Sequence, residues 1–249
     1  MSSKNTVVPL GTRQEAQLRL KQGPLRKEMR AREPVRPTTG RVVGFYPSTK
    51  NNRLIAWESQ LEQKACGLFE FSPDVVRYRE QPISVYFECD GQMRRYTPDF
   101  ELQFQDGRSI YLEVKPLAKL QNADLKRRFQ QVARFWELNG RQFGVITDVE
   151  LYHPTLHLNL KLLRAHQRVQ VSDQVRQRAV HWIATTGSAT FEQLAELLNS
   201  TTQVYALIVQ RVLHVDLFSP FSPTTTLHLP EGLGHESCLF SYRTAPDFE

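Results

Sequence analysis

The chain predicts an α/β protein, in which a mixed sheet with covering helices is followed by a smaller and mostly helical second domain. Three observations lead to this prediction. Between residues 41 and 147, short apolar or alternating segments bounded by Gly and Pro are interleaved with two helical patterns. After His153-Pro154 the strand patterns give way to helical ones. Hydrophobic residues make up 40% of the 249, which is enough to bury a core.

The first half of the chain contains six expected strands and two expected helices. Strands are expected at residues 41–46, 75–79, 83–89, 93–105, 109–115 and 143–147. Residues 57–69 carry apolar side chains at helical spacing, and residues 117–138 form a long amphipathic pattern that Asn139-Gly140 ends. Asp90-Gly91 and Asp106-Gly107 are hairpin signals, so each is expected to join two antiparallel strands.

The second half reads as a separate domain. Helices are expected at residues 172–183, 190–198 and 203–213. A loop at residues 200–202 separates the last two, as in a helix-turn-helix, and residues 218–229 are expected to form a β-hairpin wing. A winged-helix-like domain and a generic helical accessory domain both fit this spacing. The expected organisation is a basic arm at 1–40, an α/β domain at 41–154 and the helical domain at 155–249.

The positive charge of the chain is concentrated at its N-terminus. Residues 1–41 contain ten Lys or Arg and three Glu, so their net charge is +7. The whole chain has a net charge of +6, so the remaining residues sum to −1. Basic arms commonly bind phosphate backbones and release counterions as they do so. A solvated tail that aids solubility is the alternative, and the charge alone does not separate the two.

Several classes of protein are disfavoured by the sequence. No apolar run approaches the roughly 20 residues that cross a bilayer, and the first residues lack a signal-peptide pattern. The three cysteines, Cys66, Cys89 and Cys238, are far apart and form no CxxC pair, so neither a disulfide framework nor a cysteine zinc site is indicated. His153 and His157 have helical spacing but no evident third ligand, so a zinc site is rejected. A cytoplasmic protein is expected.

The central motif is Thr97-Pro98-Asp99, followed after thirteen residues by Glu113-Val114-Lys115. This is the PD-(D/E)xK pattern of nuclease cores. Hydrolysis of a phosphodiester requires a divalent cation, an activated water and neutralisation of developing charge. Carboxylates suit Mg²⁺, which prefers oxygen ligands, and a lysine ammonium can orient the water and offset charge on the phosphate. An exposed hairpin face whose charges pair with each other is the alternative, because short matches occur by chance.

The register of the two strands tests this motif. Directly opposed residues share a face, so apolar residues must pair with apolar ones. A two-residue loop at Asp106-Gly107 would pair Asp99 with Val114 and breaks the pattern. A three-residue loop, residues 105–107 with Gly107 in the left-handed region, pairs Phe100 with Leu112 and hence Asp99 with Glu113. The register favoured by burial therefore assembles the carboxylates, with Lys115 on the same face.

Other polar residues near the motif leave alternatives open. The helix at 57–69 offers Glu58 and Glu62, one turn apart, as a third acid, and helical spacing does not choose between them. Lys126-Arg127-Arg128 fits either a contact with the DNA backbone or a solvated helix face. Glu80-Gln81-Pro82 can approach the site, but a structural role at a strand end is the default. The aromatic residues of the second helix are expected in the core rather than in base stacking; they are Phe129, Phe135 and Trp136.

Four stretches together resemble the TnsA family, the endonuclease subunits of heteromeric cut-and-paste transposases, including those of CRISPR-associated transposons. They are Trp57-Glu58-Ser59-xx-Glu62, Tyr78-Arg79-Glu80-Gln81-Pro82, Thr97-Pro98-Asp99-Phe100 and Leu112-Glu113-Val114-Lys115-Pro116. The resemblance is best over residues 40–150. It implies a restriction-endonuclease-like core with a winged-helix C-terminal domain. It also favours Glu62 over Glu58, and it makes Asp99 and Lys115 firmer than Glu113, because the family position that matches Glu113 can be Gln.

The resemblance implies metal-dependent cleavage of double-stranded DNA at the 5′ ends of a transposon. The expected catalytic residues are Glu62, Asp99, Glu113 and Lys115. The expected ligands of Mg²⁺, or of Mn²⁺ in its place, are the three carboxylates and the backbone carbonyl of Val114. The implied partners are a TnsB-like transposase and a TnsC-like AAA+ ATPase, the latter docking largely through the C-terminal region. A stand-alone restriction or repair nuclease and a non-catalytic DNA-binding adaptor are the alternatives.

Overall fold

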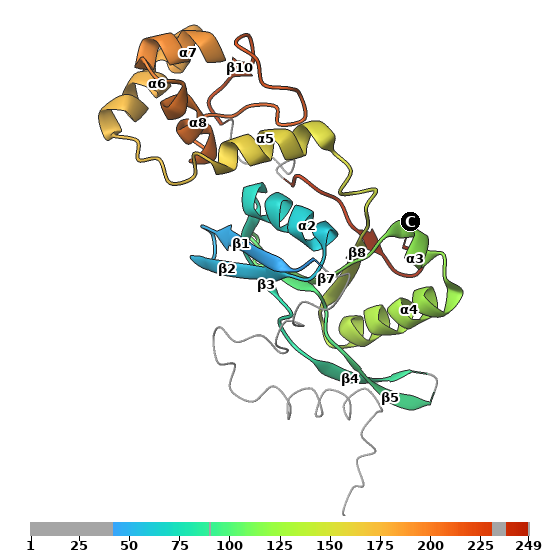
Figure 1. Ribbon diagram of the computed structural model, residues 1–249. Helices are drawn as coiled ribbons and strands as arrows, with labels where there is room; N and C mark the ends of the chain where they lie inside the picture. Colours follow the sequence, from blue (N-terminus) through green and yellow to red (C-terminus); the bar gives the residue numbers. More distant parts are fainter. Residues whose placement is uncertain (1–41, 90, 231–237, 249) are drawn as a thin grey trace, which may run out of the picture. The chain divides into compact units, whose positions relative to one another are not determined.

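The computed structural model describes residues 42–89, 91–230 and 238–248 (Figure 1). The predicted basic arm at 1–40 lies outside these residues. The chain divides into two compact units, and the described part of the first covers residues 42–66, 74–89, 91–151 and 240–248. The second contains residues 67–73, 152–230 and 238–239. Among the described residues, no helix has both the length and the apolar character needed to cross a bilayer.

A five-stranded mixed sheet forms the centre of the first unit. Its order is β11-β8-β7-β6-β3, with bounds β3 Val75–Glu80, β6 Phe100–Phe104, β7 Ser109–Val114, β8 Gln142–Ile146 and β11 Arg243–Thr244. Only β7 and β8 are parallel. A parallel pair needs a crossover connection. It is supplied by α3 (Leu117–Leu120) and α4 (Ala123–Leu138). The α/β class with a mixed sheet is thus confirmed.

Two antiparallel hairpins lie outside this sheet. Strands β1 (Gly44–Ser48) and β2 (Arg53–Trp57) form one, and β4 (Val85–Cys89) and β5 (Gln92–Tyr96) form the other. The strand expected at 93–105 is therefore wrong as one element. It is interrupted at Thr97–Asp99, where Pro98 has no N–H for a sheet ladder. The chain leaves β5 in the hairpin and enters β6 in the central sheet.

Two of the expected helices have different bounds in the structure: one begins later than predicted, and the other is divided into two helices. The helix expected from residue 57 begins only at Gln60 as α2 (Gln60–Phe71), because Trp57 is still paired with Gly44 in the β1–β2 hairpin. The long helix expected at 117–138 is two helices, because the side chain of Asn122 accepts from the N–H of Leu125 and starts α4 anew. The end of α4 lies at Asn139-Gly140 as predicted, with Gly140 at φ 66°.

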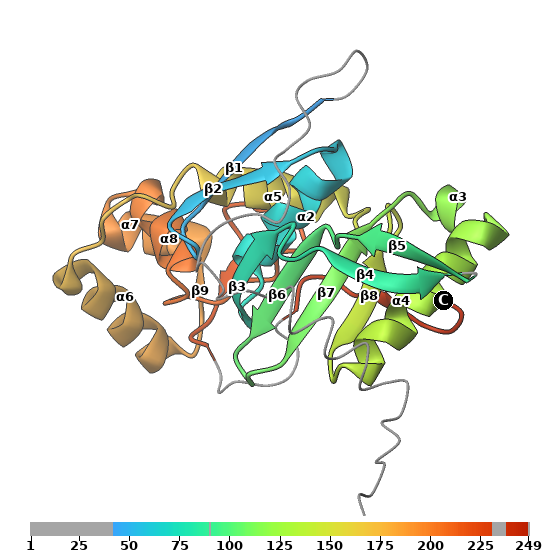
Figure 2. The ribbon, with the colours of Figure 1, turned by 90° about the horizontal axis from the view of Figure 1, so that it is seen from below.

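Helices lie on both sides of the central sheet. Figures 1 and 2 show α4 and the β4–β5 hairpin on one side and the first turns of α2 on the other. The side of α4 holds a core rich in aromatic rings, in which Tyr111 of β7 stacks on Trp136 with ring centroids 4.0 Å apart. Phe129 and Phe135 are buried in the same core, so the predicted packing role of the α4 aromatics is confirmed. Both faces of the sheet are buried, because Phe100, Leu102 and Leu112 are fully covered on the other side.

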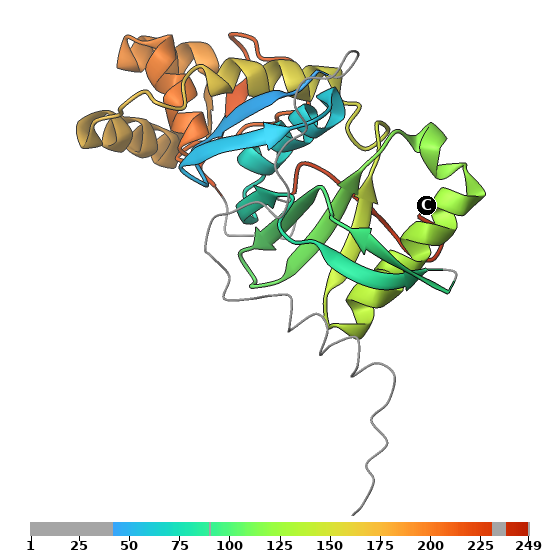
Figure 3. The ribbon, with the colours of Figure 1, turned by 60° about the horizontal axis from the view of Figure 1, so that its bottom comes forward.

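The end of the chain returns to the first unit. The sequence assigned residues 155–249 to one C-terminal domain, but β11 pairs with β8 and Phe248 packs among the aromatic rings of the α4 core. These contacts place residues 240–248 with the sheet. Figure 3 shows the segment passing along β8 and ending near α4.

The second unit is mainly helical. Its helices are α5 (Pro154–Arg164), α6 (Asp173–Thr186), α7 (Phe191–Leu198) and α8 (Thr201–Val209), together with the end of α2. The sequence prediction gave no bounds for α5. Strand β9 (Ala189–Thr190), between α6 and α7, pairs with β10 (Thr226–Leu227), and an isolated bridge joins His214 to His228. The expectation of a hairpin within 218–229 is wrong, because β10 pairs with β9 and the next residue, His228, pairs with His214 after α8.

Candidate active site

The predicted register between the two motif strands is confirmed. Phe100 lies opposite Leu112, and Leu102 lies opposite Ile110. The N–H of Phe104 donates to the carbonyl of Arg108 at 2.9 Å, which closes a three-residue loop with Gly107 at φ 83°. Continued by one residue, the same register sets Asp99 against Glu113. The alternating apolar pattern and the loop glycine together determined this arrangement.

Lys115 lies between the two motif carboxylates. Its Nζ is 2.8 Å from Oε1 of Glu113 and 3.5 Å from Oδ2 of Asp99. The Asp99 carboxylate is also anchored to the neighbouring strand, because Oδ2 accepts from the N–H of Val114 at 2.9 Å. The three side chains become less exposed from Lys115 at 33% to Asp99 at 17% and Glu113 at 7%. The structure therefore brings the predicted Asp99, Glu113 and Lys115 into one partly buried cluster.

Burial and mutual repulsion govern the charges of this cluster. Burial, followed by the charge of Glu113, raises the pKa of Asp99 well above its usual range, although Lys115 opposes the shift. Burial alone would lower the pKa of Lys115, but the carboxylates of Glu113 and Asp99 outweigh it and raise the pKa. Lys115 therefore stays protonated at neutral pH.

Glu62 is the fourth predicted member, and it also caps a helix. Burial is the main cause that raises its pKa, and the charge of Lys115 acts against that rise, so Glu62 lies within electrostatic reach of the cluster. Its Oε2 accepts from the N–H of Glu58 at 2.8 Å, and its Oε1 accepts from the hydroxyl of Ser59 at 3.0 Å. This Ser-x-x-Glu arrangement resembles a capping box at the start of α2. The helix start thus fixes the side chain beside the cluster.

Tyr96 contacts the cluster and was missed by sequence reasoning. Its hydroxyl donates to Oε2 of Glu113 at 2.6 Å. Burial and the adjacent Glu113 carboxylate raise the pKa of Tyr96 well above its usual range, so the phenol remains a donor. Glu113 is therefore held on both oxygens, by Lys115 and by Tyr96. The one available signal was that Tyr96 directly precedes Thr97-Pro98-Asp99, but no pattern indicated that its ring turns toward β7.

Gln81 belongs to the stretch for which the sequence left open an approach to the site, and it does contact a site residue. Its backbone N–H donates to the carbonyl of Asp99 at 2.8 Å, and its side-chain Nε2 donates to Oε1 of Glu58 at 2.8 Å. The carboxylate of Glu58, the alternative third acid, therefore accepts a hydrogen bond from Gln81. The structural role expected for residues 80–82 applies to Glu80, which binds Arg53. Gln81 instead contacts Asp99 and Glu58.

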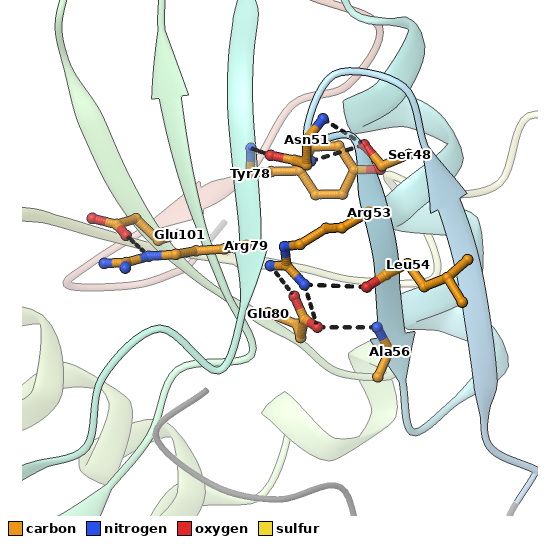
Figure 4. Close-up of polar contacts among 9 residues, drawn as sticks. All are labelled: Ser48, Asn51, Arg53, Leu54, Ala56, Tyr78, Arg79, Glu80 and Glu101. Atoms are coloured by element: carbon orange, nitrogen blue, oxygen red, sulfur yellow. Dashed lines mark hydrogen bonds and ion pairs between the residues drawn. The ribbon is translucent and has the colours of Figure 1, made fainter. Parts of the chain in front are cut away.

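Glu80 has the structural role that was expected (Figure 4). Its carboxylate accepts from two nitrogens of Arg53, at 2.9 and 2.6 Å, and from the N–H of Ala56 at 3.1 Å. Burial acts to raise the pKa of Glu80, but the hydrogen bonds and charge of Arg53 prevail and the pKa is lowered. These bonds join the β1–β2 hairpin to the end of β3, with a second ion pair between Arg79 and Glu101 alongside.

The donor atoms of the cluster suit a hard divalent cation. Glu62, Asp99 and Glu113 supply oxygen atoms, and one ammonium faces three carboxylates, so a cation would relieve the excess of negative charge. Within residues 42–89, 91–230 and 238–248, however, no three His, Cys, Asp or Glu side chains gather as a metal-binding group. In this conformation the ammonium of Lys115 lies between Asp99 and Glu113. The residues thus suit a divalent cation in their donor atoms and charge, but the three carboxylates are not gathered closely enough here to form a metal-binding group.

Comparison with known families adds an independent finding. Residues 72–148 match the family model described as TnsA-like endonuclease N terminal. The matched segment contains Gln81, Tyr96, Asp99, Glu113 and Lys115, whereas Glu62 precedes it. No curated protein matches the chain. The resemblance to TnsA that the four sequence stretches indicated is thereby confirmed.

Proposed function

On the premise that residues 72–148 form a TnsA-like endonuclease domain, we propose that this chain is a metal-dependent DNA endonuclease acting in transposition. The observation that carries the proposal is the cluster of Asp99, Glu113 and Lys115 at the ends of β6 and β7, inside the matched segment. Carboxylates with a lysine at a strand end are the chemistry that phosphodiester hydrolysis requires. The proposed catalytic residues are Glu62, Asp99, Glu113 and Lys115.

The residues have distinct tasks in this proposal. Mg²⁺, or Mn²⁺ in its place, would be held by the carboxylates of Glu62, Asp99 and Glu113 with the carbonyl of Val114, and it supplies an acidified water and charge neutralisation. Lys115 remains a cation because two carboxylates raise its pKa, so it can offset charge that develops on the phosphate. Tyr96 fixes the rotamer of Glu113 through the 2.6 Å hydrogen bond. The N–H of Val114 fixes Asp99.

The role in transposition is proposed at a finer level. We propose cleavage at the 5′ ends of a transposon, in the cytoplasm, as a subunit beside a TnsB-like transposase and a TnsC-like AAA+ ATPase. The fold proposed for the first unit is restriction-endonuclease-like. For the second unit we propose a winged helix, because β9 lies between α6 and α7 and pairs with β10, and His228, directly after β10, bridges to His214 after α8. The basic arm at 1–40 is proposed to bind the DNA backbone.

Strand mapping with an Asp99→Asn variant tests the proposal. Asn keeps the size of the side chain and an oxygen that accepts from Val114, but it removes the charge that a metal needs. Wild type assembled with its transposase should cut the 5′ ends of the element, and the variant should show background cutting with unchanged circular dichroism. Full cutting by Asp99→Asn contradicts the site. Equal cutting by the isolated wild-type chain favours a stand-alone nuclease, and no cutting in any assembly favours a non-catalytic adaptor.

A further inference from the structure

Gln81 combines two features that are unusual for a buried residue. Its φ of 44° lies in the left-handed region, where a side chain with a Cβ is strained. Its side-chain Oε1 is buried and has no hydrogen-bond partner among the described residues. Only 8% of the residue is exposed. Strain and an unpaired buried acceptor both cost free energy, and such features concentrate at functional sites.

The hydrogen bonds of Gln81 connect the two segments that carry the site carboxylates. Its N–H is bonded to the carbonyl of Asp99, and its Nε2 is bonded to Glu58. The N–H of Glu58 in turn donates to the carboxylate of Glu62. The orientation of the amide is determined by its partner, because a carboxylate accepts hydrogen bonds and so must face Nε2. The unpaired Oε1 is thus a consequence of holding Glu58.

We propose that Gln81 is a positioning residue, which fixes Glu62 at the start of α2 relative to Asp99 at the start of β6. This inference rests on the proposed function. The left-handed backbone turns the N–H toward Asp99 while the side chain reaches Glu58, so one residue bridges the sheet and the helix start. Outer partners of this kind, which contact the ligands rather than the metal, commonly change metal affinity by about 10–100-fold when they are removed.

A cycle of Gln81→Gly, Glu58→Ala and the double variant tests this role in the full chain. Glycine adopts φ 44° without strain and keeps the bond to Asp99, so it removes only the link to Glu58. Mn²⁺ binding is measured by calorimetry, with thermal unfolding of the metal-free proteins beside it. We expect each single variant to bind Mn²⁺ at least tenfold more weakly than wild type. The double variant should bind Mn²⁺ no more weakly than the weaker-binding of the two single variants, because both substitutions break the same link. We also expect Gln81→Gly to unfold no earlier than wild type.

The control is Gln103→Ala, which changes an exposed glutamine on β6 and should leave Mn²⁺ binding unchanged. Wild-type affinity in Gln81→Gly, or additive losses in the double variant, overturns the positioning role while the proposed function stands. A wild-type chain that binds no Mn²⁺ overturns both. Lower stability with unchanged affinity shows a purely structural link and also overturns the inference.

Discussion

The strand ends of the first unit and the helices α6–α8 of the second differ in how closely they follow the usual local preferences for helix capping, backbone conformation and burial of charge. The helices begin with side-chain caps at Ser172, Thr190 and Ser200, and α7 has a complete capping box with Gln193. The strand ends instead hold Asp99, whose pKa is raised by burial, and Gln81 in a strained conformation. The second unit has left-handed residues of its own in Asn199 and Arg211, but both are exposed.

This difference separates residues that serve stability from residues that serve chemistry. Natural proteins break local rules mainly at functional sites, and other regions compensate for the loss of stability. The capped helices surround an aliphatic core, in which Leu194, Leu207 and Leu227 are fully buried. The carboxylate cluster of the first unit has no such gain from packing. Substitutions in the two regions should therefore change different quantities, and four of them test this.

Lys115→Ala should have the largest effect, and it should fall on cleavage. The lysine is the one cation between Asp99 and Glu113, and its loss removes a charge positioned to stabilise the transition state. Removal of one such group typically lowers kcat by about 10²–10³-fold. The rate of 5′-end nicking by the assembled transposase measures it. Lys115→Arg should recover part of the rate by keeping the charge, and equal rates in Lys115→Ala and wild type would contradict the assigned role.

Leu207→Ala should show the opposite pattern in the second unit. Leu207 is completely buried in the aliphatic core, and truncation of such a leucine costs roughly 2–5 kcal/mol, because a cavity remains. Urea unfolding measures the loss. Leu197→Ala, at a partly buried position of the same core, is the matched control and should lose less. A loss below that of Leu197→Ala would show that this core is less tightly packed than the burial indicates.

The sequence predicted the arrangement of the motif strands because two strong local signals agreed there. Alternation of Phe100, Leu102 and Phe104 against Ile110 and Leu112 admits only one register, and Gly107 provides the loop that this register needs. The break at Pro98 and the cap at Asn122 were also visible as residue types. Hydrophobic periodicity continued through both positions and concealed them, since it reports which residues are buried and not where a ladder or helix stops.

Contacts between distant segments were not accessible to that reasoning. Tyr96 reaches Glu113 because the β4–β5 hairpin packs beside α4 over the central sheet, and Gln81 reaches Glu58 because β3 ends next to the start of α2. Neither arrangement has a period or spacing in the sequence. The pairing of β10 with β9 is of the same kind, since its partner precedes it by more than one helix. Local patterns therefore predicted elements and one hairpin, while tertiary packing determined the remaining members of the site.

Glu80→Gln should give an intermediate effect that depends on pH. The pKa of Glu80 is lowered below its ordinary 4.5 in the folded chain, so the carboxylate stabilises the fold fully above that value and loses this contribution as the pH falls through the folded pKa. Because Arg53 is partly exposed, the variant should lose about 2 kcal/mol at pH 7, less than a fully buried pair. Urea unfolding at pH 7 and well below pH 4.5 should show this difference shrinking in acid. A difference that grows in acid would contradict the ion pair.

Thr190→Ala should have the smallest effect, confined to the start of α7. The hydroxyl of Thr190 accepts from the N–H of Gln193 at 3.2 Å, and the Gln193 side chain accepts from the N–H of Thr190 at 2.8 Å. Loss of such a cap costs about 1 kcal/mol, measured by urea unfolding, and Thr190→Ser should keep nearly all of it. Thr190 also pairs with Thr226 through its backbone, which the substitution leaves intact. A loss well above 2 kcal/mol would therefore mean that the side chain also supports the β9–β10 pairing, and that in this unit capping and strand pairing are one cooperative feature.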